Sequence, residues 1–361
     1  MRGTRAVIDL PALRHNLRRA REAAPGSRVL AAIKADGYGH GLVRAARALQ
    51  GGADALGVAC LQEARELREA GIRTSIVLLE GFFHPDELPA VIEQGLEVVV
   101  HHPIQLQALE ACASARPIPV WLKVDSGMHR LGFPPDAVGD AWERLAACPA
   151  AAGPVGVMTH LANADDPADP VTEAQLAVFA GAAAACPGAA RSVANSAGVL
   201  GWPASHGDWN RPGIMLYGIS PFPGRTGADE GLRPAMTVHS QLMAVNRLQP
   251  GDRVGYGGTW TAPEAMPVGV VAAGYGDGYP RHLPSGAPVL VNGRRVPLIG
   301  RVSMDMATVD LRSQPEAQVG DPVVLWGDGL PVEEVAEWAG TIAYELVCGV
   351  THRVARLERE G

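Results

Sequence analysis

The chain has 361 residues, of which 47% are hydrophobic and 19% charged, which excludes a disordered or fibrous protein and allows one large and one smaller domain. Its formal net charge of −7, without a dense run of lysine and arginine, argues against a nucleic-acid-binding surface. The five cysteines lie far apart without a CxxC pair, and no apolar stretch is typical of a signal peptide or a membrane span, so we expect a cytoplasmic protein without a metal site.

The first two thirds of the sequence predict helices alternating with strands. A helix over 11–24 has its leucines and alanines on one face and Pro11 in its first turn. Further helical patterns include 61–71 and 172–184. Apolar runs typical of strands occur at 29–33, 55–59, 75–81, 96–100, 120–124, 155–160 and 191–195, with an eighth candidate over 209–217. About eight βα units indicate an α/β fold, a (β/α)8 TIM-type barrel over 11–228.

From residue 229 the pattern changes to short alternating segments divided by turn signals such as PGD, NG and GDG. It predicts a mainly-β C-terminal domain over 229–361, with one helix at 332–340.

Chemically active residues stand where the predicted barrel strands end, which is where barrel enzymes carry their active sites. Lys34 ends the first strand, Lys123 and Asp125 the fifth, and His160 the sixth, while Arg211 lies in the eighth unit. Taken singly, a strand-end lysine is more often an exposed side chain, and a lone histidine is more often hydrogen-bonded in place. Together at one end of one barrel, they favour a functional site.

Lys34 follows the apolar run VLAAI and precedes the glycine-rich segment ADGYGHG. Burial at a barrel mouth is expected to lower the pKa of such an amine, and a neutral amine is a nucleophile suited to Schiff-base chemistry. Pyridoxal phosphate (PLP) is the cofactor that most often uses it. Its phosphate requires a cradle, which we expect in the loops after strands seven and eight, where Ser196, Gly213 and Ile214 stand.

Several motifs in order along nearly the whole chain support a family assignment. They are IKADGYGHG, LKVDSGMHRLGF, MTHLANAD, ANSAG, NRPGIMLYGISPF, VGYGGTW, GYGDGYPR, GRVSMDMATVD and AYELVCGVTHRV. With these motifs the chain resembles the PLP-dependent alanine racemases, which are barrel-type (fold type III) PLP enzymes. The resemblance implies a homodimer, adds the N-terminal strand within 1–10 to the β-rich domain, and implies a role in supplying D-alanine for bacterial peptidoglycan.

The resemblance also implies how the cofactor is held. Lys34 would carry PLP, and Arg211 would face the pyridine nitrogen as a permanently protonated donor that keeps the ring a weak electron sink. His160 would lie beside the ring and link to Arg211. The residues implied at the phosphate are Tyr38, Tyr344, Ser196, Gly213 and Ile214.

Racemisation removes a proton from one face of Cα and returns one to the opposite face, so two bases are expected. Lys34 would serve one face, and the resemblance implies Tyr256 of the partner subunit for the other. Without the resemblance, the sequence favours the interpretation of Tyr256 as an aromatic residue in a turn of the β-rich domain.

Substrate contacts follow from the same resemblance. Met304 would bind the substrate carboxylate through its backbone N–H, also across the dimer, and Arg130 would orient cofactor and substrate. Lys123 matches a lysine that is carbamylated in many members; a plain salt bridge is the alternative. Arg301, Tyr275 and Asp277 would line the corridor to the site.

Two glycines depart from the family pattern, which is why the size of the accepted side chain stays open. Gly37 stands where alanine is common, and Gly276 interrupts what is often GYADG. A racemase of broader specificity is therefore one alternative. A barrel-type decarboxylase is another, although the string FPGR at 222–225 lacks the glutamate of its phosphate motif. A non-catalytic PLP-binding barrel would have no use for the β-rich domain.

Overall fold

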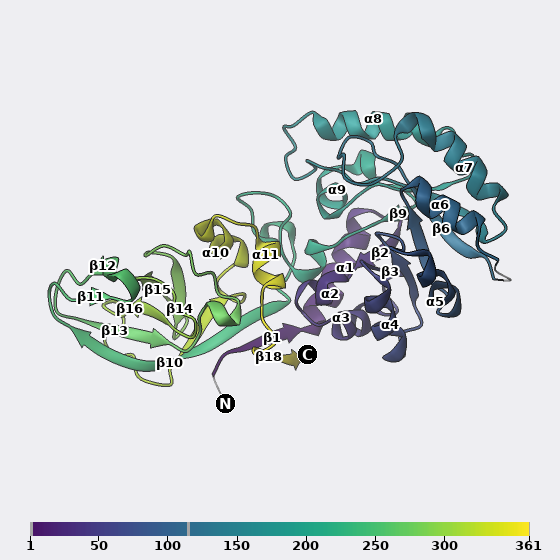
Figure 1. The fold of residues 1–361 in the computed structure, drawn as a ribbon. Coiled ribbons are helices and arrows are strands. Elements are labelled where there is room, and N and C mark those ends of the chain that lie inside the picture. The colour runs from purple at the N-terminus through teal and green to yellow at the C-terminus, as the bar shows by residue number, and fades with distance from the viewer. Residues whose placement is uncertain (1–2, 114–115, 361) are drawn as a thin grey trace.

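A closed ring of eight parallel strands forms the first part of the structure, a computed structural model that describes residues 3–113 and 116–360. A mainly antiparallel sheet forms the second part (Figure 1). The barrel strands are β2 (Arg28–Ala32), β3 (Ala55–Val58), β4 (Ser75–Leu78), β5 (Glu97–Val100), β6 (Ile118–Lys123), β7 (Ala151–Met158), β8 (Ala190–Ser192) and β9 (Trp209–Asn210). Pairing of β2 with β9 closes the ring, which confirms the predicted fold class.

Helices between the strands cover the outside of the barrel. They are α1 (Leu10–Ala23), α3 (Leu42–Leu49), α4 (Leu61–Glu69), α5 (Leu88–Glu93), α6 (Pro103–Glu110), α7 (Val138–Ala147), α8 (Val171–Ala183) and α9 (Ser196–Gly201). The start of α1 follows from the sequence, because the Asp9 carboxylate accepts a hydrogen bond from Ala12 N at 2.9 Å and Pro11 occupies the first turn.

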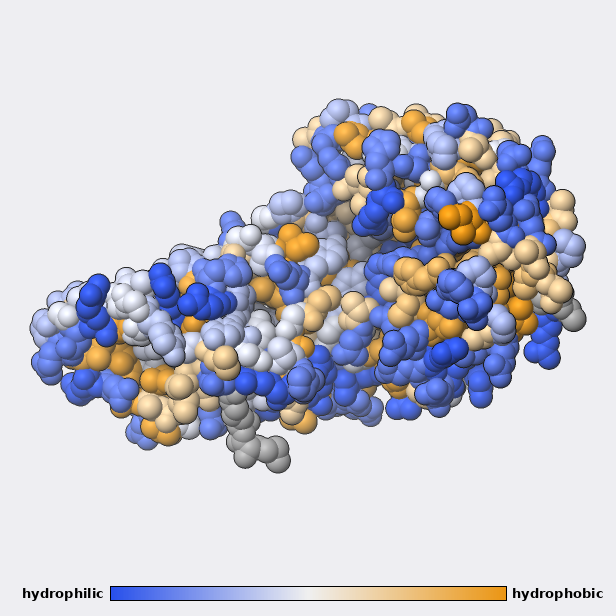
Figure 2. Space-filling model, viewed as in Figure 1, coloured by the Kyte–Doolittle hydropathy of each residue, from blue (hydrophilic) through white to orange (hydrophobic). Residues whose placement is uncertain are grey.

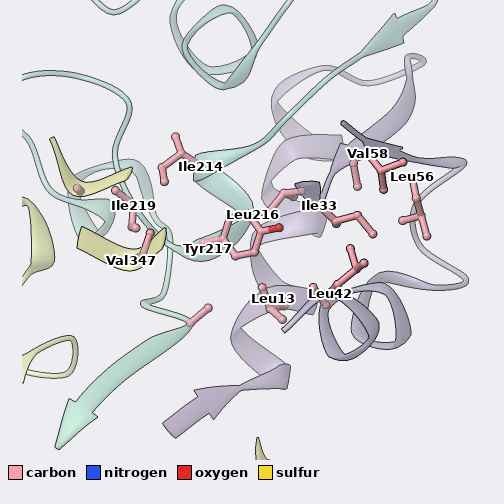
Figure 3. Packing of buried hydrophobic residues seen from close by; sticks show 14 of the residues in the cluster. Leu13, Ile33, Leu42, Leu56, Val58, Ile214, Leu216, Tyr217, Ile219 and Val347 are labelled. Carbon is pink, nitrogen blue, oxygen red and sulfur yellow. The ribbon is translucent and has the colours of Figure 1, made fainter. Parts of the chain in front are cut away.

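Two apolar layers fix the barrel. Its interior is filled by Leu30, Trp121, Trp209 and smaller residues, with the two tryptophan rings edge to face at 5.8 Å. The outer layer joins strands to helices, and Figure 3 shows Ile33 between residues of α1, α3 and β3. Lys34 therefore follows directly on a residue whose side chain is fully buried, which anchors its backbone.

The eighth strand is shorter than the sequence indicates. The predicted run 209–217 was wrong beyond Asn210, because β9 ends there and Ile214–Tyr217 forms a 3-10 helix, η4. Pro212 has no N–H for a strand ladder, so the chain leaves the sheet where Arg211 and Gly213 are needed in the loop.

The second part is an eight-stranded sheet with the order β13-β16-β15-β14-β17-β10-β1-β18, plus the pair β11-β12. Its strands are β1 (Arg5–Asp9), β10 (Met236–Leu248), β11 (Arg253–Val254), β12 (Trp260–Thr261), β13 (Met266–Val271), β14 (Pro288–Val291), β15 (Arg294–Ile299), β16 (Ala307–Asp310), β17 (Pro322–Trp326) and β18 (Ala355–Arg359). β1 pairs antiparallel with β10 and parallel with β18, so the first strand of the chain lies in this sheet. The domain limits themselves stay a prediction.

The expectation of one helix in this part was wrong. α10 (Val332–Ala339) matches the prediction, and a second helix, α11 (Ala343–Cys348), follows it. α11 has six residues, too few for a helical period to be read from the sequence. It matters because it carries Tyr344 to the barrel.

Within the described ranges, no helix is both long and apolar enough to cross a membrane, and no three histidine, cysteine, aspartate or glutamate side chains are grouped to hold a metal ion. On the face drawn in Figure 2, hydrophilic residues predominate, and hydrophobic ones form small separate patches. All five cysteines are free thiols.

Candidate active site

A cavity of about 380 Å³ opens at the carboxyl ends of the barrel strands. Ten of the twelve site residues expected from the sequence line it: Lys34, Tyr38, Lys123, Arg130, His160, Ser196, Arg211, Gly213, Ile214 and Tyr344. All but Tyr344 come from barrel loops or strand ends, and Tyr344 comes from α11. The structure therefore gathers residues that span more than 300 positions of the sequence.

The segment after Lys34 forms a left-handed turn, labelled α2 (Lys34–Tyr38) in Figure 1. Ala35 and Asp36 both have φ of 54°, and Tyr38 has φ of 50°. This backbone costs roughly 1–2 kcal/mol for each residue that has a Cβ, so tertiary contacts must hold it. Gly37, also at positive φ, adopts this conformation without that cost, so it favours the turn.

Two contacts hold the turn in place. The Asp36 carboxylate accepts from Leu42 N at 2.8 Å, and Arg356 Nε donates to the carbonyl of Gly39 at 2.8 Å. A Cβ at Gly39 would lie 1.9 Å from the carbonyl oxygen of Val347, so only glycine allows α11 to approach so closely. The same approach brings Tyr344 beside Tyr38.

Three hydroxyl groups gather at one end of the cavity. The Tyr38 and Tyr344 rings lie 6.1 Å apart, and Tyr38 also stacks on Tyr217 at 4.7 Å. Burial raises the pKa of Tyr38 to about 12 and raises that of Tyr344 further, so both phenols stay protonated donors. Ser196, the third, is buried and lines the same cavity.

Ser196 organises the loop that carries Gly213. Its Oγ accepts from Gly213 N at 2.9 Å and from Met215 N at 3.3 Å, so the hydroxyl hydrogen is left to donate elsewhere. Asn195 caps α9 by accepting from Gly198 N. A Cβ at Gly213 would stand 2.6 Å from the Tyr38 hydroxyl oxygen, so this position makes room for Tyr38.

Three hydrogen-bond acceptors fix the Arg211 side chain at the barrel mouth. It donates to Ser192 Oγ at 2.7 Å, to the carbonyl of Val193 at 3.1 Å and to the carbonyl of Thr159. Burial lowers the pKa of Arg211 to about 10, so it remains cationic near neutral pH. His160 has a pKa well below its usual range, first because of burial and then because of the Arg211 charge, and is therefore neutral.

The burial expected at Lys34 is found at Lys123 instead. The Lys34 side chain is 36% exposed, and its Nζ lies 3.3 Å from Glu80 Oε1. Lys123 is only 9% exposed. Burial, followed by the charges of Arg211 and Arg130, lowers the pKa of Lys123 to about 8.

Arg130 reaches the cavity from a loop that Asp125 shapes. The Asp125 carboxylate accepts from Gly127 N and from His129 N, each at 3.0 Å. Phe133 N donates to the carbonyl of Lys123, which returns the loop to the strand end. Asp125 thus serves the loop that presents Arg130 beside Lys123.

Tyr256 and Met304 do not line this cavity within the chain. Tyr256 begins the 3-10 segment η6 (Tyr256–Gly258) and is 68% exposed. Met304, in the loop before β16, is 52% exposed. Of the corridor residues, Tyr275 is also exposed, whereas Asp277 is buried.

Among the residues missed in the sequence are Glu80, which lines the cavity, and Tyr217, whose ring stacks on Tyr38. Glu80 ends the apolar run SIVLLEG, so its carboxylate stands at a strand end like the residues that were identified there. Tyr217, which supports Tyr38, gave no such signal because it lies in η4 and is buried.

A larger cavity of about 810 Å³ adjoins the first and shares His160, Asn195 and Tyr344 with it. Phe222 of the barrel and Ile342 beside α11 line its wall, so it lies where the two parts of the chain meet. Figure 2 shows the surface hollowed between these parts. It offers space through which a small molecule can reach the barrel mouth.

The lining residues fit PLP. Four cations, Lys34, Lys123, Arg130 and Arg211, face the cavity against the single carboxylate of Glu80, which suits a dianionic phosphate and an amino-acid carboxylate. Tyr38, Ser196 and Tyr344 supply hydroxyl donors at one end, and Lys34 supplies an amine within the same cavity.

Comparison with known proteins gives matches over both parts of the chain. The family model described as alanine racemase, N-terminal domain, matches residues 8–221, and that for the alanine racemase C-terminal domain matches residues 235–358. The chain is 58% identical over 351 residues to an alanine racemase of Nitrosococcus oceani, covering 97% of this chain and 98% of the relative. It is 55% identical over 360 residues to one of Halorhodospira halophila, covering 100% and 99%.

Solved structures agree over the same length. The biosynthetic alanine racemase from Pseudomonas aeruginosa matches with a TM-score of 0.97 at 46% identity, covering 100% of both chains. The alanine racemase from Acinetobacter baumannii matches with a TM-score of 0.93 at 39% identity, covering 99% of this chain and 100% of that one.

Proposed function

The chain belongs to the alanine racemase family and interconverts L- and D-alanine as a PLP-dependent isomerase, and we propose that Lys34 and Tyr256 are the two bases of this reaction. One observation carries the proposal. Lys34 lines the cavity at the barrel mouth, while Tyr256 lies exposed on the other part of the chain and does not line it. With Tyr256 as the second base, that base comes from a second copy of the chain.

When bound, PLP supplies an electron sink that makes the α-hydrogen of alanine acidic. Lys34 takes or returns the proton on one face of Cα. Glu80, whose Oε1 lies 3.3 Å from Lys34 Nζ, holds the amine in the cavity before the cofactor binds. Tyr256 of the second copy exchanges the proton on the opposite face.

We propose a homodimer in which Tyr256 and Met304 of one subunit complete the cavity of the other. Tyr256 and Met304 are more than half exposed, and Tyr275 and Met306 on the same part of the chain are exposed to a smaller degree. Exposed apolar side chains in a group are typical of a covered surface. In the dimer, the backbone N–H of Met304 binds the substrate carboxylate.

Tyr38, Ser196 and Tyr344 are proposed to bind the cofactor's phosphate, with the backbone of Gly213 and Ile214 completing the cradle. Arg211 donates to the pyridine nitrogen and, as a cation held by three protein acceptors, does not give up its proton. Neutral His160 lies beside the ring. Its direct hydrogen bond to Arg211, expected from the sequence, stays a prediction.

Arg130 is proposed to orient the substrate, with a carbamylated Lys123 as its partner. Three observations support the modification. Lys123 is buried, burial lowers its pKa to about 8, and the neighbouring charges of Arg130, Arg211 and Lys34 favour an anion at this position. A carbamate would replace the positive charge of Lys123 by a negative charge, which the three neighbouring cations attract.

The cellular setting is also a proposal. Five free thiols suit a reducing cytoplasm, and D-alanine is a precursor for peptidoglycan. A racemase of broader specificity remains the second candidate, since Gly276 stands at the proposed corridor.

Chiral chromatography of alanine after incubation with PLP-loaded protein tests the proposal. Wild-type protein should bring L-alanine to an equal mixture of enantiomers. The Lys34→Ala variant should leave it unchanged. Turnover of that variant without added amine would remove Lys34 from the mechanism, and faster turnover of serine than of alanine would favour the broader racemase.

A further inference from the structure

We propose that Arg353, which no motif assigned a role, is a positioning residue that fixes the backbone of Met304. The inference rests on the proposed role of Met304 as the donor to the substrate carboxylate. It concerns the substrate site of the partner subunit, although every contact below lies within one chain.

Both peptide groups that flank Met304 are held by the segment 274–277. Ser303 O, on the peptide whose N–H belongs to Met304, accepts from Tyr275 N at 3.0 Å. Met304 O, on the next peptide, accepts from Gly276 N at 2.8 Å. Because a trans peptide is planar, fixing each carbonyl also fixes the direction of its N–H. The direction of the Met304 N–H is therefore set by segment 274–277.

Arg353 ties this segment to the Met304 loop. Its Nε donates to Asp277 Oδ1 at 2.7 Å, and its Nη2 donates to Asp305 Oδ1 at 2.7 Å and to Met304 O at 3.4 Å. Asp277 in turn accepts from Gly274 N at 2.9 Å. One guanidinium thus bridges the carboxylates on either side and reaches the carbonyl of Met304 itself.

The segment that carries Arg353 is itself anchored. Thr351 Oγ1 donates to the carbonyl of Gly276 at 2.9 Å, and Thr351 N donates to that of Asp277 at 3.2 Å. A Cβ at Gly276 would lie 2.9 Å from Arg353 Cζ. Glycine at 276, one of the two departures from the family pattern, therefore gives the guanidinium its place over the loop.

The same arrangement explains why an arginine serves here. Its planar fork presents Nε and Nη2 to two carboxylates at once, which the single ammonium of lysine cannot reproduce. Asp277 is 4% exposed and Asp305 is 47% exposed as side chains, so the bridge runs from a buried anchor to the surface loop.

The test is steady-state kinetics of the PLP-loaded enzyme, with the inhibition constant of propionate as a second reading of carboxylate binding. Arg353→Ala should raise KM for alanine and Ki for propionate about 10-fold and change kcat little, because it weakens binding alike in ground state and transition state. Arg353→Lys should restore only part of the affinity. The absorbance of bound PLP and the mass of the assembled protein under native conditions should not change.

A matched control is available in the same part of the chain. Arg312 also bridges two carboxylates, donating to Asp310 at 2.7 Å and to Glu264 at 2.8 Å, and has a similar exposure. Arg312→Ala should leave KM and Ki unchanged. An equal rise in both arginine variants would mean that the effect is general loosening, and the inference would be wrong.

Two further variants separate the possible failures. Gly276→Ala keeps Arg353 but displaces its guanidinium, and it should raise KM and Ki in the same direction, even if Arg353→Ala does not fold. Met304→Pro removes the proposed donor. If Met304→Pro leaves Ki unchanged, the proposed role of Met304 fails. If Met304→Pro raises Ki but Arg353→Ala and Gly276→Ala do not, Met304 keeps its role and the inference about Arg353 is refuted.

Discussion

Carbon dioxide should modify Lys123 at neutral pH, and the structure gives the size of the effect. Its pKa of about 8 lies below the ordinary value of 10.5. At pH 7.5 about a quarter of Lys123 is then neutral, against about one part in a thousand for an ordinary lysine. The neutral amine attacks the carbon of CO₂ and loses a proton, which yields a carbamate anion.

The sign of the stability effect follows from the same pKa. Burial in the folded protein disfavours the charged form of Lys123 and so lowers the free energy of unfolding. This loss of stability is fully present below about pH 8, where Lys123 is charged in both states, and it disappears as the pH rises toward 10.5. The cost is about 3 kcal/mol for this buried group. Carbamylation removes it and adds attraction to Arg130, so CO₂ should raise the melting temperature by several degrees.

The assay compares wild-type protein with Lys123→Met in CO₂-free buffer and after addition of ¹³C-bicarbonate at pH 7.5. Wild type should show a carbamate carbon signal in NMR and a higher melting temperature with bicarbonate. Lys123→Met should show neither and should melt higher than wild type without CO₂. Wild type without a carbamate signal, melting alike in both buffers, would refute the reasoning.

Three further outcomes follow from the cavity. Gly213→Ala should lower the affinity for PLP about 10-fold, because the new Cβ would stand 2.6 Å from the Tyr38 hydroxyl oxygen. The control is Gly181→Ala, whose Cβ would lie in open space on α8, and this variant should bind PLP normally. Titration of each variant with PLP, followed by absorbance, compares the two. Tyr256→Phe should keep PLP bound and lose about a thousandfold in kcat, and normal turnover would contradict the two-base mechanism. Lys34→Ala should show no PLP on its peptides after borohydride reduction and digestion, and labelled peptide elsewhere would locate a different lysine.

Much of this site can be predicted from the sequence, because the carboxyl ends of all barrel strands lie at the same end of the barrel. Lys34, Lys123 and His160 each follow an apolar run, and the fold class that brings those runs together is confirmed. Glu80 followed the same rule and was missed only because its run was read as strand to the end.

Other features depend on tertiary contacts that no local pattern contains. The left-handed turn at Ala35 and Asp36 goes against the preference of both residues and is held by Arg356 from the far end of the chain. Which lysine is buried depends on the direction of its side chain. Burial was expected for Lys34, but the structure shows it for Lys123. Tyr256 lies on the surface of one chain, and only the resemblance gave it a role.

Mixing two inactive variants tests the shared site most directly. Lys34→Ala and Tyr256→Phe proteins are dissociated, mixed in equal amounts and reassembled, and racemisation is measured against each variant alone. If Tyr256 acts across the dimer, half of the dimers are mixed and each has one intact site, so about a quarter of wild-type activity should return. If activity stays at the level of the separate variants although mass spectrometry shows mixed dimers, Tyr256 does not serve the partner's cavity and the account is contradicted.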